Sequence, residues 1–210
     1  MTLAIATLAD LLKASNIEFS RISNEQLSVT AEGEHHTRRR GVPLRRLKIT
    51  TAPMPNADAL ALLAIVEAAA NMQEDFLCYD KRQPYPATDP DGSIFATSTP
   101  VISAITDRYT VSFTGFPSTY VVPAGAWLQI VDDTSRYYLG QVMGTKTASG
   151  GAISSLKLSV PMPDFVEVGG AATVIKASAK FRLEPETAYL TDVGLVNASL
   201  VLSAIQTYDK

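Results

Sequence analysis

The second half of the chain is a succession of short runs in which apolar and polar residues alternate. In DRYTVSFTGF, this alternation places Tyr109, Val111 and Phe113 on one face. Shorter runs follow, separated by turn sequences such as VDDTS, TASGG and EVGG, and they read WLQIV, RYYLGQV, ISSLKLSV, ATVIKA and AKFRL. Alternation with a period of two residues is typical of half-buried strands. Strands at this spacing predict an antiparallel β-barrel or sandwich.

A proline-rich stretch separates these runs from the N-terminal part of the chain. KRQPYPATDPDGS holds three prolines and a Pro-Asp-Gly turn, which is the composition of a linker. After Ala177 a long apolar β pattern returns in YLTDVGLVNASLVLSAIQ, which fits a long closing strand or a hairpin. We therefore predict a mainly β protein with two domains. Residues 1–90 and 177–210 form the first domain, and residues 95–176 form a small antiparallel β-barrel, OB-like or a sandwich, inserted into it.

One segment of the first domain has helical character and no clear polar face. ADALALLAIVEAAAN predicts a helix over Ala57–Ala70, with Asn56 as its N-cap and Asp58 in its first turn. Its only charged residues are Asp58 and Glu67, so we expect it to be buried on more than one side, within a subunit or between subunits. At about 21 Å the helix is too short to cross a membrane.

The remaining N-terminal segments predict strands and one ambiguous element. Thr7–Ser15 has helical spacing for about two turns, or is an extended arm. The stretch that follows mixes short alternating runs with polar spacers, which predicts one or two strands around a loop at Glu32–Thr37. In LRRLKITTAPM, Leu47 and Ile49 alternate with Arg46, Lys48 and Thr50, which predicts a half-buried strand. DFLCYD predicts a buried strand in which the lone cysteine, Cys78, acts as a small hydrophobe.

The stretch HHTRRRGVPLRRLKIT concentrates basic residues. Six of the 18 lysines and arginines lie between Arg38 and Lys48. The stretch lacks the interleaved aromatic residues and the recognition-helix pattern of nucleic-acid contacts. His35 and His36 are a poor metal site, because adjacent extended residues point to opposite faces and arginines repel a cation. We expect the basic residues to pair with carboxylates of the same or an adjacent subunit, to line a channel, or to form a solvated edge.

Charge and composition narrow the function further. Only 19% of residues are charged against 46% hydrophobic, so we expect part of the surface to be covered by protein. The net charge of −3 gives no field that attracts DNA to the whole molecule. Residues 1–50 carry +3 and the rest −6, an asymmetry that favours head-to-tail attraction between copies or is an accident of composition.

Motifs that carry catalysis are missing from the sequence. It has no glycine-rich phosphate loop and no nucleophile elbow. The stretch Asp89–Gly92 begins like a calcium loop but lacks the closing glutamate, so it predicts a turn. The N-terminus lacks the basic region of a secretion signal, and synthesis in the cytoplasm is the default expectation. We expect no enzymatic activity, no cofactor and no bound metal.

The order of these elements resembles the distal tail proteins of long-tailed, non-contractile bacteriophages. A basic strand leads into an alanine-rich helix, a short buried strand and then a β block. The resemblance is carried by short motifs at Gly115-Phe116, Ala124–Trp127, Tyr138–Val142 and Gly151–Pro161. The sequence departs from the family at Ala126, where an acidic residue is frequent, and at Leu47, where a tryptophan is frequent.

The resemblance implies a structural virion protein of the phage tail tip. Members form a six-fold ring, built from a belt-like β domain, that joins the tail tube protein to the tail hub protein. If the basic stretch lines the channel of such a ring, we expect it to contact the tape measure protein or DNA passively. The N-terminal apolar stretch carries Asp10 and is too short to span a bilayer, so we expect no membrane anchor. The candidate subunit-interface residues are the basic strand residues and three helix residues, Arg45, Arg46, Lys48, Leu60, Leu63 and Glu67.

Two other classes of function remain open on the sequence. A carbohydrate- or ligand-binding β domain requires an exposed aromatic platform, and the candidates are Trp127, Tyr137 and Tyr138. Alternation predicts that at least one of the two tyrosines lies in the core, which weakens this alternative. An enzyme is the third class, and no residue of the sequence supports it.

Overall fold

The computed structural model describes residues 14–23, 25–29, 32–39, 41–71, 74–96, 98–184, 188–191, 193–194 and 196–208. The ambiguous segment from Thr7 therefore lies outside the described residues up to Lys13, and Ala14 and Ser15 begin a strand. The protein is mainly β, with 48% of its residues in strands and a single helix among the described elements. None of the described helical residues forms a segment of the length and apolarity that crossing a membrane needs.

Contacts divide the chain into two compact units. Unit 1 comprises Met1–Ser20, Arg45–Arg82 and Ser178–Asp209. Unit 2 comprises Arg21–Leu44 and Gln83–Ala177, with Lys210. Residues 21–44 thus group with unit 2, although the sequence pattern predicts them in the first domain.

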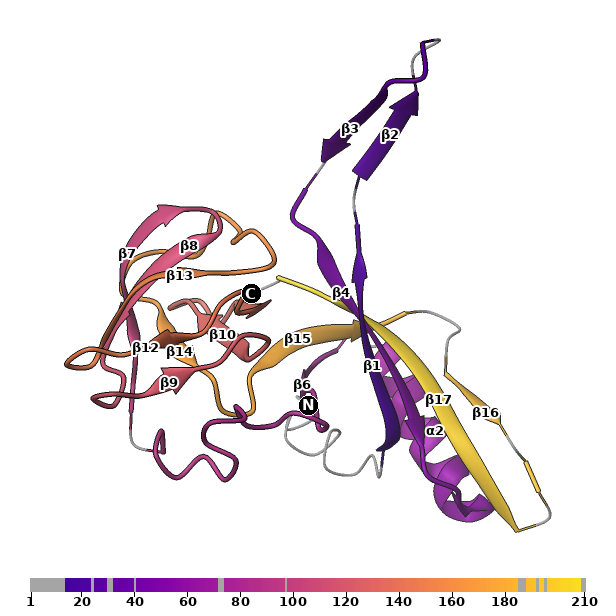
Figure 1. Ribbon diagram of the computed structural model, residues 1–210. Coiled ribbons are helices and arrows are strands. Elements are labelled where there is room, and N and C mark those ends of the chain that lie inside the picture. The colour runs from indigo at the N-terminus through magenta and orange to yellow at the C-terminus, as the bar shows by residue number, and fades with distance from the viewer. Residues whose placement is uncertain are drawn as a thin grey trace. The chain divides into compact units, whose positions relative to one another are not determined.

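Unit 1 contains a seven-stranded sheet (Figure 1). Its main path runs in the order β1 (Ala14–Ile22), β4 (Leu44–Thr51), β17 (Asn197–Gln206), β15 (Ser178–Leu183) and β6 (Asp75–Tyr79). Two short strands, β16 (Tyr189–Thr191) and β5 (Met54–Pro55), also pair with β17. The C-terminal apolar pattern is therefore a β16–β17 hairpin whose long strand pairs with β4.

Alternation along these strands gives the sheet one apolar face. Leu47 and Ile49 of β4 lie opposite Ala204 and Leu202 of β17, and all four are buried. The apolar face also gathers aromatic rings, because Phe181 of β15 lies 5.8 Å from Phe19 and 6.2 Å from Phe76 between ring centroids. The predicted strand at DFLCYD is confirmed as β6, with Cys78 buried.

The helix α2 (Asn56–Asn71) extends the predicted Ala57–Ala70 by one residue at each end. Its buried residues recur at helical spacing and form one stripe, Ala59, Leu62, Val66 and Ala69. The helix contacts β17 and β15, so this stripe covers the apolar face of the sheet (Figure 1). The side-chain amide of Asn56 donates to the carbonyl of Gly194 at 3.1 Å, which ties the start of the helix to the segment before β17.

Unit 2 is built around a six-stranded antiparallel sheet that curls into a half-barrel. Its strands lie in the order β11 (Tyr137–Gln141), β10 (Trp127–Val131), β14 (Ala171–Thr173), β7 (Val101–Asp107), β8 (Thr110–Thr114) and β13 (Ala152–Lys157). Two shorter strands, β9 (Val121–Val122) and β12 (Lys146–Thr147), form a separate antiparallel pair. In the sequence they fall between strands of the six-stranded sheet. Every alternating run between 107 and 183 thus contains a strand.

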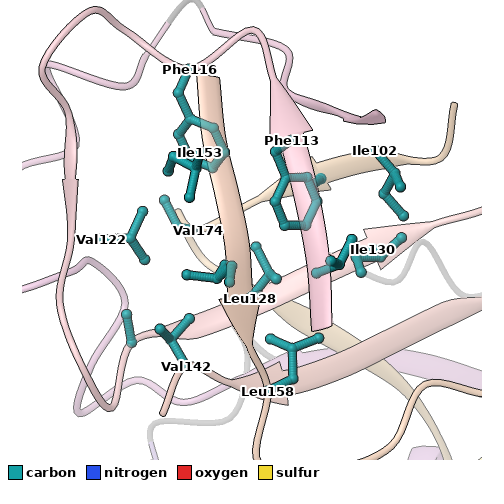
Figure 2. Close-up of a cluster of buried hydrophobic side chains, with 14 of the residues drawn as sticks. Ile102, Phe113, Phe116, Val122, Leu128, Ile130, Val142, Ile153, Leu158 and Val174 are labelled. Carbon is teal, nitrogen blue, oxygen red and sulfur yellow. The ribbon is translucent and has the colours of Figure 1, made fainter. Parts of the chain in front are cut away.

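The core of unit 2 lies inside this curled sheet. Figure 2 shows apolar side chains from many strands converging, among them Ile102, Phe113, Phe116, Val122, Leu128, Ile130, Val142, Ile153, Leu158 and Val174. Val111 and Phe113 are buried as predicted. Tyr109 was predicted to share their face but is 39% exposed, because it lies in the two-residue turn between β7 and β8.

A buried carboxylate organises the linker that enters unit 2. Asp89 is completely buried, and its oxygens accept hydrogen bonds from the backbone N–H groups of Ile94 at 3.2 Å and Phe95 at 3.0 Å. The hydroxyl of Tyr120 lies 3.4 Å from the same carboxylate. The stretch Asp89–Gly92 is therefore a turn held by its own aspartate, as the sequence predicts.

The chain leaves unit 1 after β6 and returns to it at β15, with the segment 83–177 of unit 2 in between. Tyr79, at the end of β6, pairs directly with Ser178, at the start of β15. All the described pairings of β15 and β17 are with unit 1 strands. The strands that flank the insertion are thus neighbours in the sheet, although about a hundred residues separate them in sequence.

Candidate subunit interface

The basic strand is β4, and its residues divide between two environments. Arg46 and Lys48 are exposed, whereas Leu47 and Ile49 are fully buried, so the predicted alternation is confirmed. Arg45 shares the buried face and is only 8% exposed. Alternation along an extended strand separates adjacent side chains onto opposite faces. The basic cluster is therefore not one continuous charged surface.

Arg45 differs from the other candidate interface residues of β4 because it is buried. Its backbone N–H donates to the side-chain oxygen of Gln206 at 3.1 Å, a bond that fixes the start of β4 to the end of β17. Burial raises the pKa of Tyr208, and the nearby positive charge of Arg45 opposes that increase. Arg45 is therefore packed within the single chain, and its side chain offers little surface to a second subunit.

The opposite face of the sheet carries charged residues, and we call it the charged face. It consists of Arg46, Lys48, Asp75, Arg182 and Glu184. Arg46 donates to Glu184 at 2.9 Å, across two segments 138 positions apart. Arg182 holds Asp75 with two hydrogen bonds, of 2.9 and 3.2 Å. Lys48 is exposed and has no ion pair with any described residue. The predicted pairing of Arg46 with a carboxylate therefore occurs within the chain, and Lys48 is available to a partner.

The three helix candidates lie in different positions on α2. Leu60 is 57% exposed, Leu63 is half-buried and Glu67 is exposed. At 100° per residue, the exposed residues form a continuous apolar surface on the side away from the sheet. We call this surface the exposed α2 face, and it consists of Leu60, Ala61, Ala64, Ile65 and Ala68. Asp58 and Glu67 lie at its two borders.

Two hollows flank the exposed α2 face. An apolar groove of about 330 Å³ lies between the first half of the helix and the chain before it, lined by Ala52, Pro53, Met54, Pro55, Asp58, Ala61, Leu62 and Ile65. A more polar hollow of about 410 Å³ lies at the C-terminal half and includes Glu67 and Glu184. The last turn of α2 has no basic residue, so the negative end of the helix dipole adds to these carboxylates.

The two histidines lie on a strand, not in a loop. β2 (Glu25–Val29) and β3 (His35–Arg39) form an antiparallel hairpin, so the predicted loop over Glu32–Thr37 ends before His35. The imidazole of His36 lies 3.7 Å from Glu34, and both side chains are exposed. Nowhere in the described residues do three or more histidine, cysteine, aspartate or glutamate side chains gather as a metal site would require.

Strands on both sides of this loop agree with the sequence, which predicts one or two strands around it, but β3 begins at His35, inside the predicted loop. Figure 1 shows the two strands of the hairpin side by side, and the side chains described on them are all exposed, namely Gln26, Ser28, Val29, His35, His36 and Arg38. A two-stranded hairpin by itself is marginally stable in water. The available signal is that HHTRR contains no apolar residue, so a strand there has no side chain to bury.

The aromatic candidates for a sugar platform do not form one. Tyr138 is fully buried, as alternation predicts, and its hydroxyl donates to the carbonyl of Val160. Trp127 is 7% exposed and Tyr137 is half-buried. Cys78 is likewise buried, and burial raises the pKa of its thiol to about 12, so it stays protonated at neutral pH.

Comparison with known proteins adds no relative. A scan against protein-family models finds no match, and no curated protein matches the chain.

Proposed function

We propose that this protein is a structural subunit of a phage tail tip, which assembles into a ring that joins the tail tube to the tail hub. The observation that carries the proposal is the exposed α2 face. One stripe of the helix is buried against the sheet, while Leu60, Ile65 and the alanines between them are exposed. An apolar surface of this kind on an under-charged chain favours a permanent protein interface.

The charged face contributes to the proposed assembly less than the exposed α2 face does. Exposed ion pairs contribute about 0–1 kcal/mol each, so Arg46 and Lys48 set register between subunits and do not supply the main affinity. Burial of apolar surface supplies that affinity. The proposed ring has a mass six times that of the 22.5 kDa chain and resides in the virion after assembly in the host cytoplasm.

The proposed partners are a second copy of this chain, the tail tube protein and the tail hub protein. Passive contact with the tape measure protein or DNA in the channel belongs to the same proposal. We propose no catalytic activity, cofactor or metal, since the chain offers the structural surfaces described above and the sequence shows no catalytic motif.

Native mass spectrometry of the purified chain tests the proposal. We expect a six-fold oligomer for the wild type and loss of assembly for Leu60→Asp, because a charge on the exposed α2 face cannot be desolvated cheaply. Ile94→Asp is the control, since Ile94 is also 57% exposed but lies in unit 2. A wild-type chain that remains at 22.5 kDa at every concentration contradicts the proposal.

The role of the charged face is tested by following assembly against salt concentration. Replacement of Arg46 and Lys48 together by alanine should weaken assembly at low salt and leave it unchanged at high salt, because screening removes the same interactions. The matched control is Arg108→Ala, which breaks an exposed ion pair with Asp164 in unit 2. A double variant that assembles like the wild type at every ionic strength would show that the charged face is only a solvated edge.

A further inference from the structure

The apolar groove beside α2 lies next to the start of β1, where the described part of the chain begins. Its walls are the residues that join β4 to the helix and four residues of the helix, namely Ala52–Pro55, Asp58, Ala61, Leu62 and Ile65. We propose that the segment directly before β1, LAIATLADLLK over residues 3–13, occupies this groove in its own chain.

The register of β1 against β4 brings this segment to the groove. The two strands are neighbours in the sheet and run in opposite directions (Figure 1). The hydroxyl of Ser20 donates to the carbonyl of Arg46 at 3.5 Å. Six steps back along β1 from Ser20 and six steps forward along β4 from Arg46 lead to Ala14 and Ala52. The chain before Ala14 therefore starts beside the first residue of the groove.

Burial supports this register. It sets Ile17 opposite Ile49, and both side chains are buried, as expected for opposite residues that share one face of a sheet. Lys13 precedes Ala14 directly, so the segment needs no linker to reach the groove. Tethering favours the chain's own segment over that of another copy, because binding within one chain takes place at a high effective concentration.

The polarity of the groove selects the conformation of the segment. An extended segment would place Asp10 on the same side as Leu8 and Leu12, against an apolar lining. Helical spacing instead places Leu8, Leu11 and Leu12 on one side and Asp10 on the other. The segment therefore binds as an amphipathic helix, whose leucines bury apolar surface together with the groove.

Charge sets the direction of the segment in the groove. Asp58 is the charged residue among those that line the groove, it is exposed, and it has no ion pair with any described residue. Lys13 is the basic residue of the segment and lies at its end next to Ala14. The two opposite charges are thus brought to the same groove, and a cation at the end of a helix also complements the helix dipole.

Occupation of the groove leaves most of the proposed ring interface uncovered. Ala61 and Ile65 belong both to the groove and to the exposed α2 face. At 100° per residue, Leu60, Ala64 and Ala68 lie further round the helix, away from the groove. The inference therefore concerns the single chain and does not rest on the ring.

Thiol labelling of the full chain, at concentrations too low for assembly, tests whether the groove is covered. Ile65 lies in the groove and is 38% exposed, whereas Leu60 lies outside it on the same helix and is 57% exposed. These fractions differ less than two-fold, but a covering segment should slow labelling of Ile65→Cys about ten-fold relative to Leu60→Cys. Adding Leu8→Asp and Leu12→Asp should remove this protection and leave the labelling of Leu60→Cys unchanged. Cys78 is buried and does not compete.

Equal labelling of Ile65→Cys with and without the two aspartates overturns the inference. Thr7→Asp is the matched control, since it adds the same charge beside the leucine stripe and should leave Ile65→Cys protected. Circular dichroism of each variant checks that the helical signal of α2 is retained.

Disulfide trapping identifies the chain that supplies the segment. A chain carrying both Leu8→Cys and Ile65→Cys should form an internal disulfide on oxidation and run as a monomer on a non-reducing gel. Lys48→Cys replaces Ile65→Cys in the control, because Lys48 is exposed on the charged face of the sheet, opposite α2. It should form the internal disulfide about ten-fold more slowly. A disulfide-linked dimer overturns the inference, since the segment would then belong to another copy.

Discussion

Arg45 and Arg46 are adjacent in sequence and have different physical roles. Arg45 is buried beside the end of β17, whereas Arg46 is exposed and holds Glu184. A count of basic residues cannot distinguish them, because the register of β4 decides which side chain meets solvent. The same register selects Lys48 as the cation of this strand that is available for an intermolecular contact.

At the residue scale, Asp132 makes stability depend on pH. Burial alone would raise the pKa of Asp132, but hydrogen bonds from the backbone of Arg136, the hydroxyl of Thr134 and the guanidinium of Arg136 outweigh burial and lower it to about 2. An unfolded aspartate has a pKa near 3.9. Ionised Asp132 therefore stabilises the fold above about pH 4, and this contribution is lost as the pH falls towards 2.

Urea unfolding between pH 7 and pH 2 measures this contribution, with the fluorescence of the single tryptophan, Trp127, as the probe in unit 2. Asp132→Asn should have a lower free energy of unfolding than the wild type at pH 7, and the difference should shrink between about pH 4 and pH 2. The neighbouring Asp133→Asn is the control and should show no such change. A loss in the free energy of unfolding of Asp132→Asn that is the same at every pH would contradict a lowered pKa of Asp132.

At the element scale, the sequence predicts those elements whose pattern reports burial. The helix is recognisable because Asp58 and an unbroken apolar run follow Asn56, and β4 because Leu47 and Ile49 alternate with charges. β7 escaped prediction because Ile102 is its only buried residue and its register shifts twice. β3 begins inside the predicted loop, and the sequence places its start too late because none of its described side chains is buried. Patterns of burial cannot reveal strands that are held by backbone pairing alone.

The candidate site was predictable only in part for a related reason. Leu60 and Glu67 follow from the helical period, and Lys48 from alternation in β4. The Arg46–Glu184 pair joins positions 138 apart, so no local signal reveals it. The burial of Arg45 likewise depends on β17, whose position beside β4 is a property of the assembled sheet.

Two leucines on α2 test how the helix divides its surface. Leu62→Ala removes a side chain that is 8% exposed and should lower the free energy of unfolding by about 2–4 kcal/mol, from lost burial and the cavity left behind. Leu60→Ala makes the same chemical change at a position that is 57% exposed. It should change the stability of the dissociated chain by less than about 0.5 kcal/mol. Chemical denaturation at concentrations too low for assembly measures both, and equal losses would contradict the division.

At the scale of the whole molecule, the insertion point predicts that unit 1 tolerates removal of the barrel. Tyr79 and Ser178 are paired neighbours, so replacement of residues 80–177 by Asn-Gly should close β6 and β15 into a two-residue hairpin. We expect the shortened chain to keep the helical signal of α2 in circular dichroism and to unfold cooperatively. The matched control is the same replacement with two prolines, which cannot form this turn. A shortened Asn-Gly chain without cooperative unfolding would show that unit 1 depends on the barrel.

The pairing of Arg45 with Gln206, 161 positions apart, has a consequence for the order in which the chain folds. During synthesis β4, α2 and β6 emerge long before β15 and β17, the strands that lie between β4 and β6 in the finished sheet. Until then the apolar stripe of α2 has no complete sheet to cover. The strands of unit 2 between 101 and 173 are contiguous in sequence and can fold first, and their folding draws the ends of β6 and β15 together. Earlier folding of the barrel therefore lowers the loop-closure entropy that is lost when β6 and β15 pair.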